Sequence, residues 1–411
     1  MRLLYSFSIQ LYSFFINTAA LFGNKKAVLW TSGRKNWKEE LNNINHEKRK
    51  LTWFHVASLG EFEQARPIIE QIRKQEPREF ILISFFSPSG YEVRKNFNLA
   101  DKVVYLPADT QKNAKIFLKL TRPNRVIFIK YEFWFNYLNQ IHKQNIECYL
   151  ISGIFRKNQH FFKPYGTWFR KHLIAFTHFF VQNEQSLKLL NSVGFKNVSQ
   201  TGDTRLDRVL TITKEEFYEP RFESFSKECK IVIFGSSWEK ENELAIYFSK
   251  SDLQSKIIIA PHEINPTKIK TLKEQFSQSC KLLSETEFNE DLSLINILII
   301  DQIGLLSKLY RYANISVIGG GFGSGIHNTL EAAIYGCPVI FGPNYQKFQE
   351  AYDLIEVGAG FCITNQEEFI SIMSILLKNE LHYEKAVESS KKYISQNAGA
   401  TAKITKHLYT N

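Results

Sequence analysis

The segment Ser316-Val-Ile-Gly-Gly-Gly-Phe-Gly-Ser-Gly-Ile-His-Asn-Thr-Leu-Glu331, continued by Ala-Ala-Ile-Tyr-Gly-Cys-Pro-Val-Ile-Phe-Gly-Pro343, decides the fold of this chain. The apolar, β-branched run at 315–318 predicts a strand, and five glycines follow within residues 319–325. The periodic apolar residues after the glycines predict a helix start, and Gly336 to Pro343 predicts a second buried strand. Strand, loop, helix and strand in this order form a parallel βαβ unit.

The glycine run predicts a sugar-nucleotide pocket. Glycines such as Gly320 and Gly321 let the backbone approach a ligand closely, and free N–H groups at a helix start suit a phosphate. Asn328 and Glu331 stand three apart on one face of the first turn, where Glu331 could accept hydrogen bonds from two ribose hydroxyls. The alternative is a simple helix cap in which Glu331 serves only the helix dipole, although a cap would not need the glycines.

Length and composition favour an enzyme of two domains in a reducing compartment. The chain has 411 residues, 44% of them apolar, which is enough to build two cores. Its net charge of +11 favours anionic partners such as phospholipid, phosphorylated glycolipid or nucleic acid. The five cysteines are scattered, odd in number and without a CxxC pair, which argues against disulfides and structural zinc.

The N-terminus makes a membrane a better partner than nucleic acid. Residues 3–22 contain no charge and are followed by Lys25, Lys26, Arg34 and Lys35. We therefore expect residues 1–24 to be a membrane anchor or an interfacial helix, with a core helix as the alternative. If the segment spans, the basic residues after it place the main body in the cytoplasm.

Short apolar strands alternate with amphipathic stretches along the whole chain, which predicts an α/β fold with two Rossmann-like, doubly wound domains facing across a cleft. We expect an N-terminal domain at 25–208, a linker at 209–228 and a C-terminal domain at 229–411. The strands expected are 53–58, 80–85, 103–106, 125–129, 148–152 and 179–182 in the first domain, and 229–234, 256–260, 295–300, 315–318 and 338–341 in the second.

Two carboxylates follow strands of the predicted first domain. Glu61 comes after a strand and Gly60, at the start of a helix, where it could act as the base of a transferase. A role in the helix dipole alone is the alternative. Glu132 lies among aromatic residues, where burial could raise its pKa, with an ordinary ion pair to Lys130 or Arg125 as the rival account.

The second domain offers polar groups for a nucleotide. Ser236 and Ser237 follow a strand at a probable helix start, where they could bind a phosphate or simply cap the helix. His262 follows the next strand and could contact base or phosphate, although a lone histidine is usually structural. The sequence contains no Asp-x-Asp pair, no metal-ligand cluster and no Walker-type lysine, so we expect neither a metal nor another cofactor.

Taken in order, these motifs resemble the 3-deoxy-D-manno-oct-2-ulosonic acid (Kdo) transferases of lipopolysaccharide synthesis, a family with the glycosyltransferase-B fold. The resemblance covers nearly the whole chain. The matching motifs are Gly33-Arg34, Ala57-Ser-Leu-Gly-Glu61, Ser87-Pro-Ser-Gly90, Tyr105-Leu-Pro-Ala-Asp109, Glu132-Phe-Trp-Phe-Asn136, Thr201-Gly-Asp-Thr-Arg-Leu-Asp207, Gly235-Ser-Ser237, Pro261-His262, Gly319-Gly-Gly321, His327-Asn328 with Glu331, and Gly336-Cys-Pro-Val-Ile-Phe-Gly-Pro343.

The resemblance implies inverting, metal-independent transfer of Kdo from CMP-Kdo to a lipid A precursor at the cytoplasmic face of the inner membrane. Glu61 matches the family's catalytic base, and Glu132 matches an acidic residue on the acceptor side. The positions that match groups around the CMP moiety are Ser236, Ser237, His262, Gly320, Gly321, Asn328 and Glu331. Possible contacts to the sugar or the acceptor are Arg34, Gly60, Arg156 and Arg205.

The chain departs from the family pattern on the acceptor side. Lys130 stands where the family usually has a second acidic residue, and Ser152-Gly-Ile154 replaces an Asn-Ala-Arg, a loss for which Arg156 could compensate. Three other functions stay open: a glycosyltransferase of the same fold that uses a UDP-sugar, a sugar-nucleotide epimerase, and a non-catalytic, membrane-tethered nucleotide-binding protein.

Overall fold

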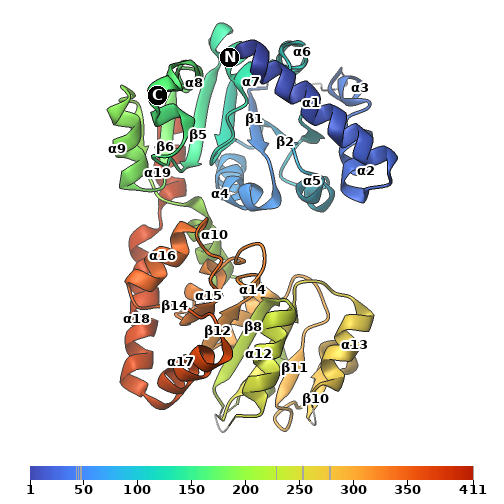
Figure 1. The fold of residues 1–411 in the computed structure, drawn as a ribbon, viewed down its shortest axis with the longest axis vertical. Coiled ribbons are helices and arrows are strands. Elements are labelled where there is room, and N and C mark those ends of the chain that lie inside the picture. Colours follow the sequence, from blue (N-terminus) through green and yellow to red (C-terminus); the bar gives the residue numbers. More distant parts are fainter. Residues whose placement is uncertain are drawn as a thin grey trace. The chain divides into compact units, whose positions relative to one another are not determined.

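The computed structural model describes residues 1–42, 44, 46, 49–227, 229–251, 254–276 and 279–410. The chain forms two compact units (Figure 1). Unit 1 comprises residues 1–208 and 398–411, and unit 2 comprises residues 209–397.

Unit 1 contains a seven-stranded parallel sheet in the order β3-β2-β1-β4-β5-β6-β7. Its strands are β1 Leu51–Val56, β2 Phe80–Phe85, β3 Lys102–Tyr105, β4 Arg125–Ile129, β5 Glu147–Gly153, β6 His178–Val181 and β7 Val198–Gln200. Every residue of β1 and β2 is buried, because helices cover both faces of the sheet. The strand order reverses between β1 and β4, and such a switch point is where open α/β sheets bind ligands.

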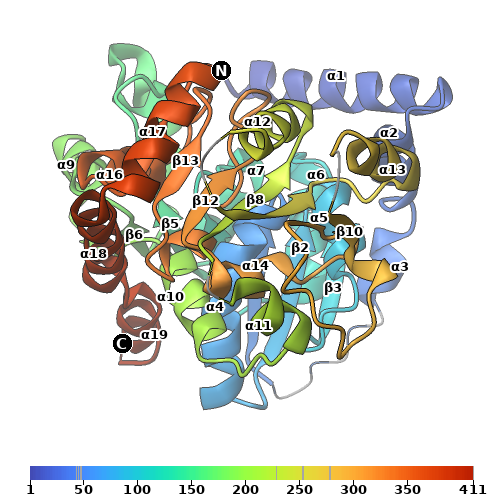
Figure 2. The ribbon, with the colours of Figure 1, turned by 90° about the horizontal axis from the view of Figure 1, so that it is seen from below.

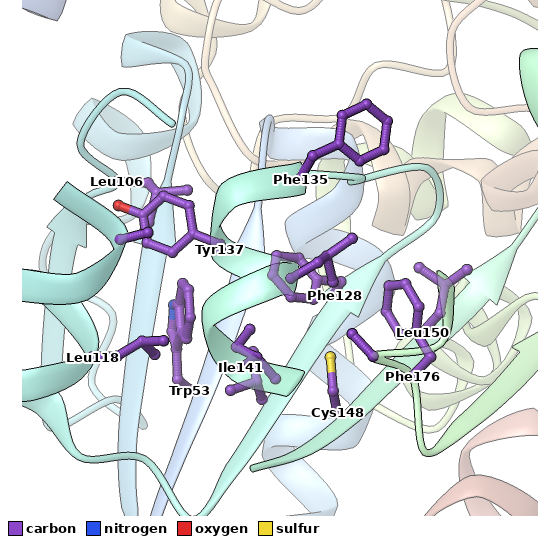
Figure 3. Close-up of a cluster of buried hydrophobic side chains, with 14 of the residues drawn as sticks. Trp53, Leu106, Leu118, Phe128, Phe135, Tyr137, Ile141, Cys148, Leu150 and Phe176 are labelled. Atoms are coloured by element: carbon purple, nitrogen blue, oxygen red, sulfur yellow. The ribbon is translucent and has the colours of Figure 1, made fainter. Parts of the chain in front are cut away.

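Aromatic side chains fill much of the core on one face of this sheet. Trp53 of β1 packs against Phe117, Phe128 and Tyr137. Figure 3 labels Trp53, Phe128 and Tyr137 of this group.

The helices of unit 1 are α1 Arg2–Leu21, α2 Lys25–Ser32, α3 Trp37–Asn42, α4 Leu59–Gln75, α5 Pro88–Arg94, α6 Gln111–Thr121, α7 Phe135–Lys143, α8 Thr167–Leu173, α9 Glu184–Ser192, α10 Thr204–Thr213 and α19 Ala400–Thr410. Helix α10 runs on into unit 2. Unit 1 also contains the short 3-10 turns η1 His160–Phe162 and η2 Pro164–Gly166.

Unit 2 contains a second seven-stranded parallel sheet, in the order β10-β11-β9-β8-β12-β13-β14. Its strands are β8 Ile231–Ser237, β9 Lys256–Pro261, β10 Cys280–Leu282, β11 Ile297–Ile299, β12 Ile315–Ile318, β13 Val339–Phe341 and β14 Gly360–Cys362. Its other elements are α11 Pro220–Ser226, α12 Glu239–Ser249, α13 Pro266–Glu274, η3 Leu283–Glu285, α14 Leu306–Leu309, η4 Tyr310–Tyr312, α15 Leu330–Ala333, α16 Gln349–Glu356, α17 Gln366–Lys378 and α18 Glu380–Asn397. Figure 2 shows α12, α13 and α17 along one face of this sheet, and α11 and α14 on the other.

The two parallel α/β sheets expected from the sequence are confirmed. Three strands were not predicted, namely β7, β10 and β14. Each of them has three residues and lies at or next to an edge of its sheet, so it has too few apolar positions to give a periodic signal.

The linker expected at 209–228 is partly helical. It contains the end of α10 and all of α11, whose Phe222 and Phe225 are fully buried. These two rings stand three residues apart, so they lie on one face of a short helix that packs on unit 2. Glu228, at the end of the expected linker, lies outside the described residues.

The last helix belongs to unit 1, although the sequence analysis assigned all of residues 229–411 to the second domain. Arg125, buried at the start of β4, donates to the Leu408 carbonyl at 3.2 Å. The Tyr409 hydroxyl donates to Glu79 at 2.9 Å. These bonds satisfy polar groups inside unit 1, and they explain why α19 packs there.

The N-terminal segment forms helix α1, which rests on unit 1 through its tyrosines. The Tyr5 hydroxyl donates to Asp109 at 2.5 Å, and the Tyr12 ring stacks on Phe86. Large apolar side chains of the same helix face outward: Phe7 is 61% exposed and Phe14 is 62% exposed. In the described part of the chain, no helix has the length and apolar character needed to cross a membrane.

Candidate active site

Glu61 lies where β1 ends and α4 begins, at the switch point of the first sheet. It is the third residue of α4, and its Oε2 accepts hydrogen bonds from the backbone N–H groups of Ala57, at 2.6 Å, and Ser58, at 2.9 Å. Glu61 therefore also caps the start of α4. Among the described residues Oε1 has no hydrogen-bond partner, so one oxygen is fixed and the other is available.

The surroundings of Glu61 give it the proton affinity of a base that works near neutral pH. Burial raises the pKa of Glu61 to about 7, and the nearby charge of Glu132 contributes in the same direction. His55 and the Ala57 N–H oppose this rise in pKa because both favour the carboxylate. A carboxylate with such a pKa can accept a proton from a hydroxyl and release it again.

Glu132 lies in the loop between β4 and α7, inside an aromatic pocket. Its Oε2 accepts a hydrogen bond from the Trp134 indole at 2.6 Å and lies 3.3 Å from His55 Nε2. Burial raises the pKa of Glu132 to about 7. The ion pair to Lys130 or Arg125 that the sequence left open is not found among the described residues, because Arg125 pairs with Glu79 at 3.5 Å and the Lys130 ammonium lies over the Tyr131 ring.

His55 was missed by the sequence analysis. It lies within β1 with a completely buried ring, and it contacts Glu132 across the sheet. The available signal was a titratable side chain inside a strand that is otherwise apolar.

In unit 2, the glycine loop follows β12 and is shaped by close backbone contacts. A Cβ at Gly319 would lie 1.9 Å from the Ser236 carbonyl oxygen, and one at Gly321 would lie 2.5 Å from the Gly342 nitrogen. Gly320 has a φ of +88°, and its N–H donates to Glu241 Oε1 at 3.0 Å. The loop therefore needs glycine for packing as well as for access to a ligand.

Glu241 holds the glycine loop and was also missed by the sequence analysis. It is the third residue of α12, and its second oxygen accepts the N–H of Trp238 at 3.0 Å. A carboxylate three residues after a helix start signals a cap, but nothing local in the sequence connects it to the glycine loop.

Asn328 and Glu331 contact each other at the start of α15, as their spacing predicted. Asn328 Nδ2 donates to Glu331 Oε1 at 2.9 Å, and the amide oxygen of Asn328 accepts the Leu330 N–H at 3.2 Å. This bond orients the Glu331 carboxylate.

Three rings gather beside the glycine loop. The His262 ring stacks between Trp238, with centroids 4.6 Å apart, and His327, with centroids 4.3 Å apart. The Trp238 indole donates to His327 Nε2 at 3.1 Å. Burial and the neighbouring His262 lower the pKa of His327 to about 4, so this ring accepts the bond as neutral imidazole.

A cavity of about 340 Å³ adjoins these groups, within unit 2. Its lining includes Trp238, Lys268, Gly320 and Phe322. An aromatic ring, a cation and a glycine backbone around one cavity suit an anionic ligand with a planar group. In the described residues, no group of three or more His, Cys, Asp or Glu side chains could hold a metal ion.

Comparisons with known proteins show which family the chain resembles. Residues 35–208 match the family model described as 3-deoxy-D-manno-octulosonic-acid transferase (kdotransferase). The chain is 26% identical to the 3-deoxy-D-manno-octulosonic acid transferase of Rickettsia bellii, over 85% of each chain. It is also 26% identical to that of Aquifex aeolicus, over 85% of this chain and 91% of the relative. The chain is thus similar to Kdo transferases over most of its length.

Solved structures agree with the fold of this family. The UDP-GlcNAc 2-epimerase from Neisseria meningitidis bound to UDP-GlcNAc has a TM-score of 0.63 at 18% identity, covering 88% of this chain and 100% of the other. The calicheamicin glycosyltransferase CalG4 has a TM-score of 0.57 at 12% identity, covering 88% and 98%. At these identities the likeness shows the fold alone, which is of the glycosyltransferase-B type.

Arg34, expected from the family resemblance to contact the sugar or the acceptor, is instead built into unit 1. Its guanidinium lies over the Trp30 ring, and burial lowers its pKa to about 9. It donates to three backbone carbonyls, those of Trp30, Phe86 and Leu106. These bonds tie the end of α2 to the loops after β2 and β3.

The remaining residues expected to contact the sugar or the acceptor have different surroundings. Arg205 pairs with Asp203 at 2.6 Å. Arg156 lies over the Tyr131 ring, 5.9 Å from its centroid, and the Lys130 ammonium lies over the same ring. Gly60 has room for a side chain, since a Cβ there would meet only the Ser58 hydroxyl, at 3.9 Å.

The two serines at the end of β8 also differ from each other. Ser236 has a φ of +52°, in the left-handed region, which brings its carbonyl against the glycine loop. The Ser237 hydroxyl is buried, and among the described residues it has no hydrogen-bond partner. A buried hydroxyl without a partner is a candidate ligand contact.

Proposed function

We propose that this chain transfers Kdo from CMP-Kdo to a hydroxyl of a lipid A precursor, with inversion at the anomeric carbon and with Glu61 as the general base. The observation that carries the proposal is the Glu61 carboxylate. One of its oxygens is held by two backbone N–H groups, and burial brings its pKa to about 7. Similarity to Kdo transferases supports Kdo as the transferred sugar.

In the proposed reaction, Oε1 of Glu61 takes the proton from the acceptor hydroxyl while the hydroxyl oxygen forms a bond to the anomeric carbon of Kdo. The bond between that carbon and the phosphate oxygen breaks, and its electron pair leaves with CMP. Attack occurs on the side opposite the leaving group, which inverts the configuration. Glu132 contributes its carboxyl on the acceptor side.

For the donor, we propose that the cavity beside the glycine loop holds CMP. The oriented Glu331 carboxylate would accept the ribose hydroxyls, and the Ser237 hydroxyl, Gly320 and Gly321 would lie near the phosphate. His262, held in its ring stack, would contact the nucleotide. The chemistry needs no further cofactor.

For the acceptor, we propose that α1 lies in the cytoplasmic surface of the inner membrane. Its outward side carries large apolar side chains, and Lys25 and Lys26 follow at the start of α2. An apolar helix face next to basic residues is typical of interfacial helices that bind anionic lipid. This location would bring the enzyme to a lipid acceptor.

The test is mass spectrometry of a lipid A precursor incubated with CMP-Kdo and the purified chain. Wild type should add the mass of Kdo, and the number of increments gives the number of sugars transferred. Glu61→Gln should lower the rate by at least about a hundredfold, the usual contribution of a general base. Glu63→Gln is the matched control, because Glu63 lies on the same helix and pairs with Arg94 at 2.9 Å.

The competing functions predict different results. A glycosyltransferase of another specificity would turn over UDP-sugars and ignore CMP-Kdo. A non-catalytic nucleotide-binding protein would bind CMP and show no product with any donor. Either result from a folded wild-type chain would overturn the assignment.

A further inference from the structure

The His55 ring is buried between two strands of the unit 1 sheet, in a position where both of its nitrogens need partners. It lies in β1, opposite Ser84 of β2, and its side chain has no exposed surface. An unpaired polar nitrogen in such a place costs free energy, so the neighbours of each nitrogen determine where the proton lies.

The neighbours of Nδ1 assign it the proton. Nδ1 lies 3.1 Å from the Ser84 carbonyl oxygen and 2.9 Å from the Ser84 hydroxyl. A carbonyl oxygen can only accept, so it favours an N–H at this position. The Ser84 hydroxyl already accepts the Trp53 indole N–H at 2.7 Å, and its own hydrogen can reach the Phe54 carbonyl at 3.5 Å.

With the proton on Nδ1, Nε2 carries a lone pair. The polar atom facing it is Glu132 Oε2, at 3.3 Å. Among the described residues, Nε2 has no hydrogen-bond partner. If the carboxyl were ionised, lone pairs would face each other in a buried site. A proton on Oε2 removes this repulsion and gives Nε2 its partner.

The charges around the pair do not favour a second proton on the imidazole. Burial lowers the pKa of His55 to about 3, although the charge of Glu61 and the bond to Ser84 act in the opposite direction. Arg34 disfavours the imidazolium further. The other titratable groups that act on this carboxylate pair are Lys130, at the end of β4, and Tyr5 of α1.

We propose that His55 is a positioning residue for the transfer: by accepting a hydrogen bond from Oε2 of Glu132, it keeps that carboxyl neutral, so that Glu61 is the member of the pair that ionises. The effect of His55 on catalysis rests on the proposed function, whereas the placement of the proton on Glu132 does not depend on it. Glu61 is the better carboxylate, because two backbone N–H groups and the start of α4 favour its negative charge. Other active sites also contain two carboxyls that share one proton, so that one carboxyl is neutral while the other is ionised.

The direct test uses the wild-type chain and measures the proton itself. Infrared spectroscopy at pH 7 should show the C=O band of a protonated, buried carboxyl, which persists in Glu61→Gln and disappears in Glu132→Gln. Nitrogen-15 NMR of labelled histidine should show a buried ring protonated on Nδ1 and not on Nε2. A missing band, or a band removed by Glu61→Gln instead, would overturn the proposal.

Two variants of His55 test whether the proton on Glu132 affects catalysis. The amide introduced by His55→Asn can still donate to Ser84 but is too short to reach Glu132, whereas His55→Gln can place an amide oxygen near Oε2. We expect His55→Asn to lose the Glu132 band, to lower kcat at least about tenfold and to change KM for CMP-Kdo less than about twofold. His55→Gln should recover part of both the band and kcat.

The outcomes separate a positioning role from a structural one. Equal losses of kcat in both variants, with the Glu132 band unchanged, would show that His55 serves only packing and would sink the proposal. If both variants failed to fold, the wild-type spectra would still decide where the proton lies. A wild-type chain that shows the band but transfers no Kdo would contradict the proposed function, and it would support the proton placement.

Discussion

Glu61 and Glu132 of unit 1 are buried to the same extent but have different neighbours. Glu61 accepts two backbone N–H groups, whereas Glu132 lies between an indole and an imidazole. Because hydrogen-bond donors stabilise a carboxylate and an apolar pocket does not, the same type of side chain can serve as base in one place and as acid in the other.

The raised pKa of Glu132 predicts how stability depends on pH. Its pKa is about 7 in the folded chain and about 4.3 when unfolded, so the folded state binds more protons between these values. The free energy of unfolding therefore falls as pH rises through this window. Glu132→Gln, which stays neutral, should be about 1 to 3 kcal/mol more stable than wild type at about pH 8 and nearly equal at about pH 4.5.

Chemical unfolding of both proteins at the two pH values measures this difference. Glu63→Gln, at a partly exposed glutamate that pairs with Arg94 at 2.9 Å, serves as the control. A Glu132→Gln variant that is less stable than wild type at the higher pH would show that the ionised carboxylate is well solvated or paired in the folded chain.

Helix α1 combines two kinds of contact along its length. Tyr5 and Tyr12 attach it to unit 1, while Phe7 and Phe14 face outward. A helix with this division is held by the protein on one side and needs another apolar partner on the other. The proposed partner is the membrane surface.

Replacing Phe7 and Phe14 together by serine should weaken binding to anionic vesicles by more than about tenfold, because each buried phenyl ring contributes about 1.5 to 3 kcal/mol. Vesicle flotation measures the bound fraction. Phe288→Ser is the matched control, since Phe288 of unit 2 is 56% exposed and its loss should leave binding unchanged. Equal binding by wild type and the double variant would exclude α1 as the membrane contact.

The chain returns to unit 1 at its C-terminus, so that unit 1 is built from both ends of the sequence. Helix α19 buries Ala400, Ile404 and Leu408 against unit 1. The Gly399 and Thr401 N–H groups, at the start of this helix, donate to Asp207, the last residue of the motif that begins at Thr201. Unit 1 should therefore depend on α19 for its stability.

Ile404→Ala removes a fully buried side chain and should lower the stability of unit 1 by about 2 to 4 kcal/mol. Hydrogen exchange should quicken in β1, β2 and α4 and stay unchanged in β8 and β12. Lys403→Ala, on the exposed side of the same helix, should have little effect. Faster exchange in the strands of unit 2 would show that α19 stabilises the other unit.

Local features of the sequence determined the kind of fold and the main candidates of the site. Apolar runs bounded by glycine and proline predicted the long strands, and Glu61 was found because it directly follows one of them. These signals depend on neighbours along the chain, since hydrophobic period and turn residues act locally.

Only the tertiary structure decided which distant residues meet. The contact of His55 with Glu132 depends on β1 lying next to β4, and the bond of Glu241 to Gly320 depends on β8 lying next to β12. The same holds for the packing of α19 on unit 1. Strand order and the burial it creates arise from the packing of the whole sheet, so no local pattern in the sequence encodes them.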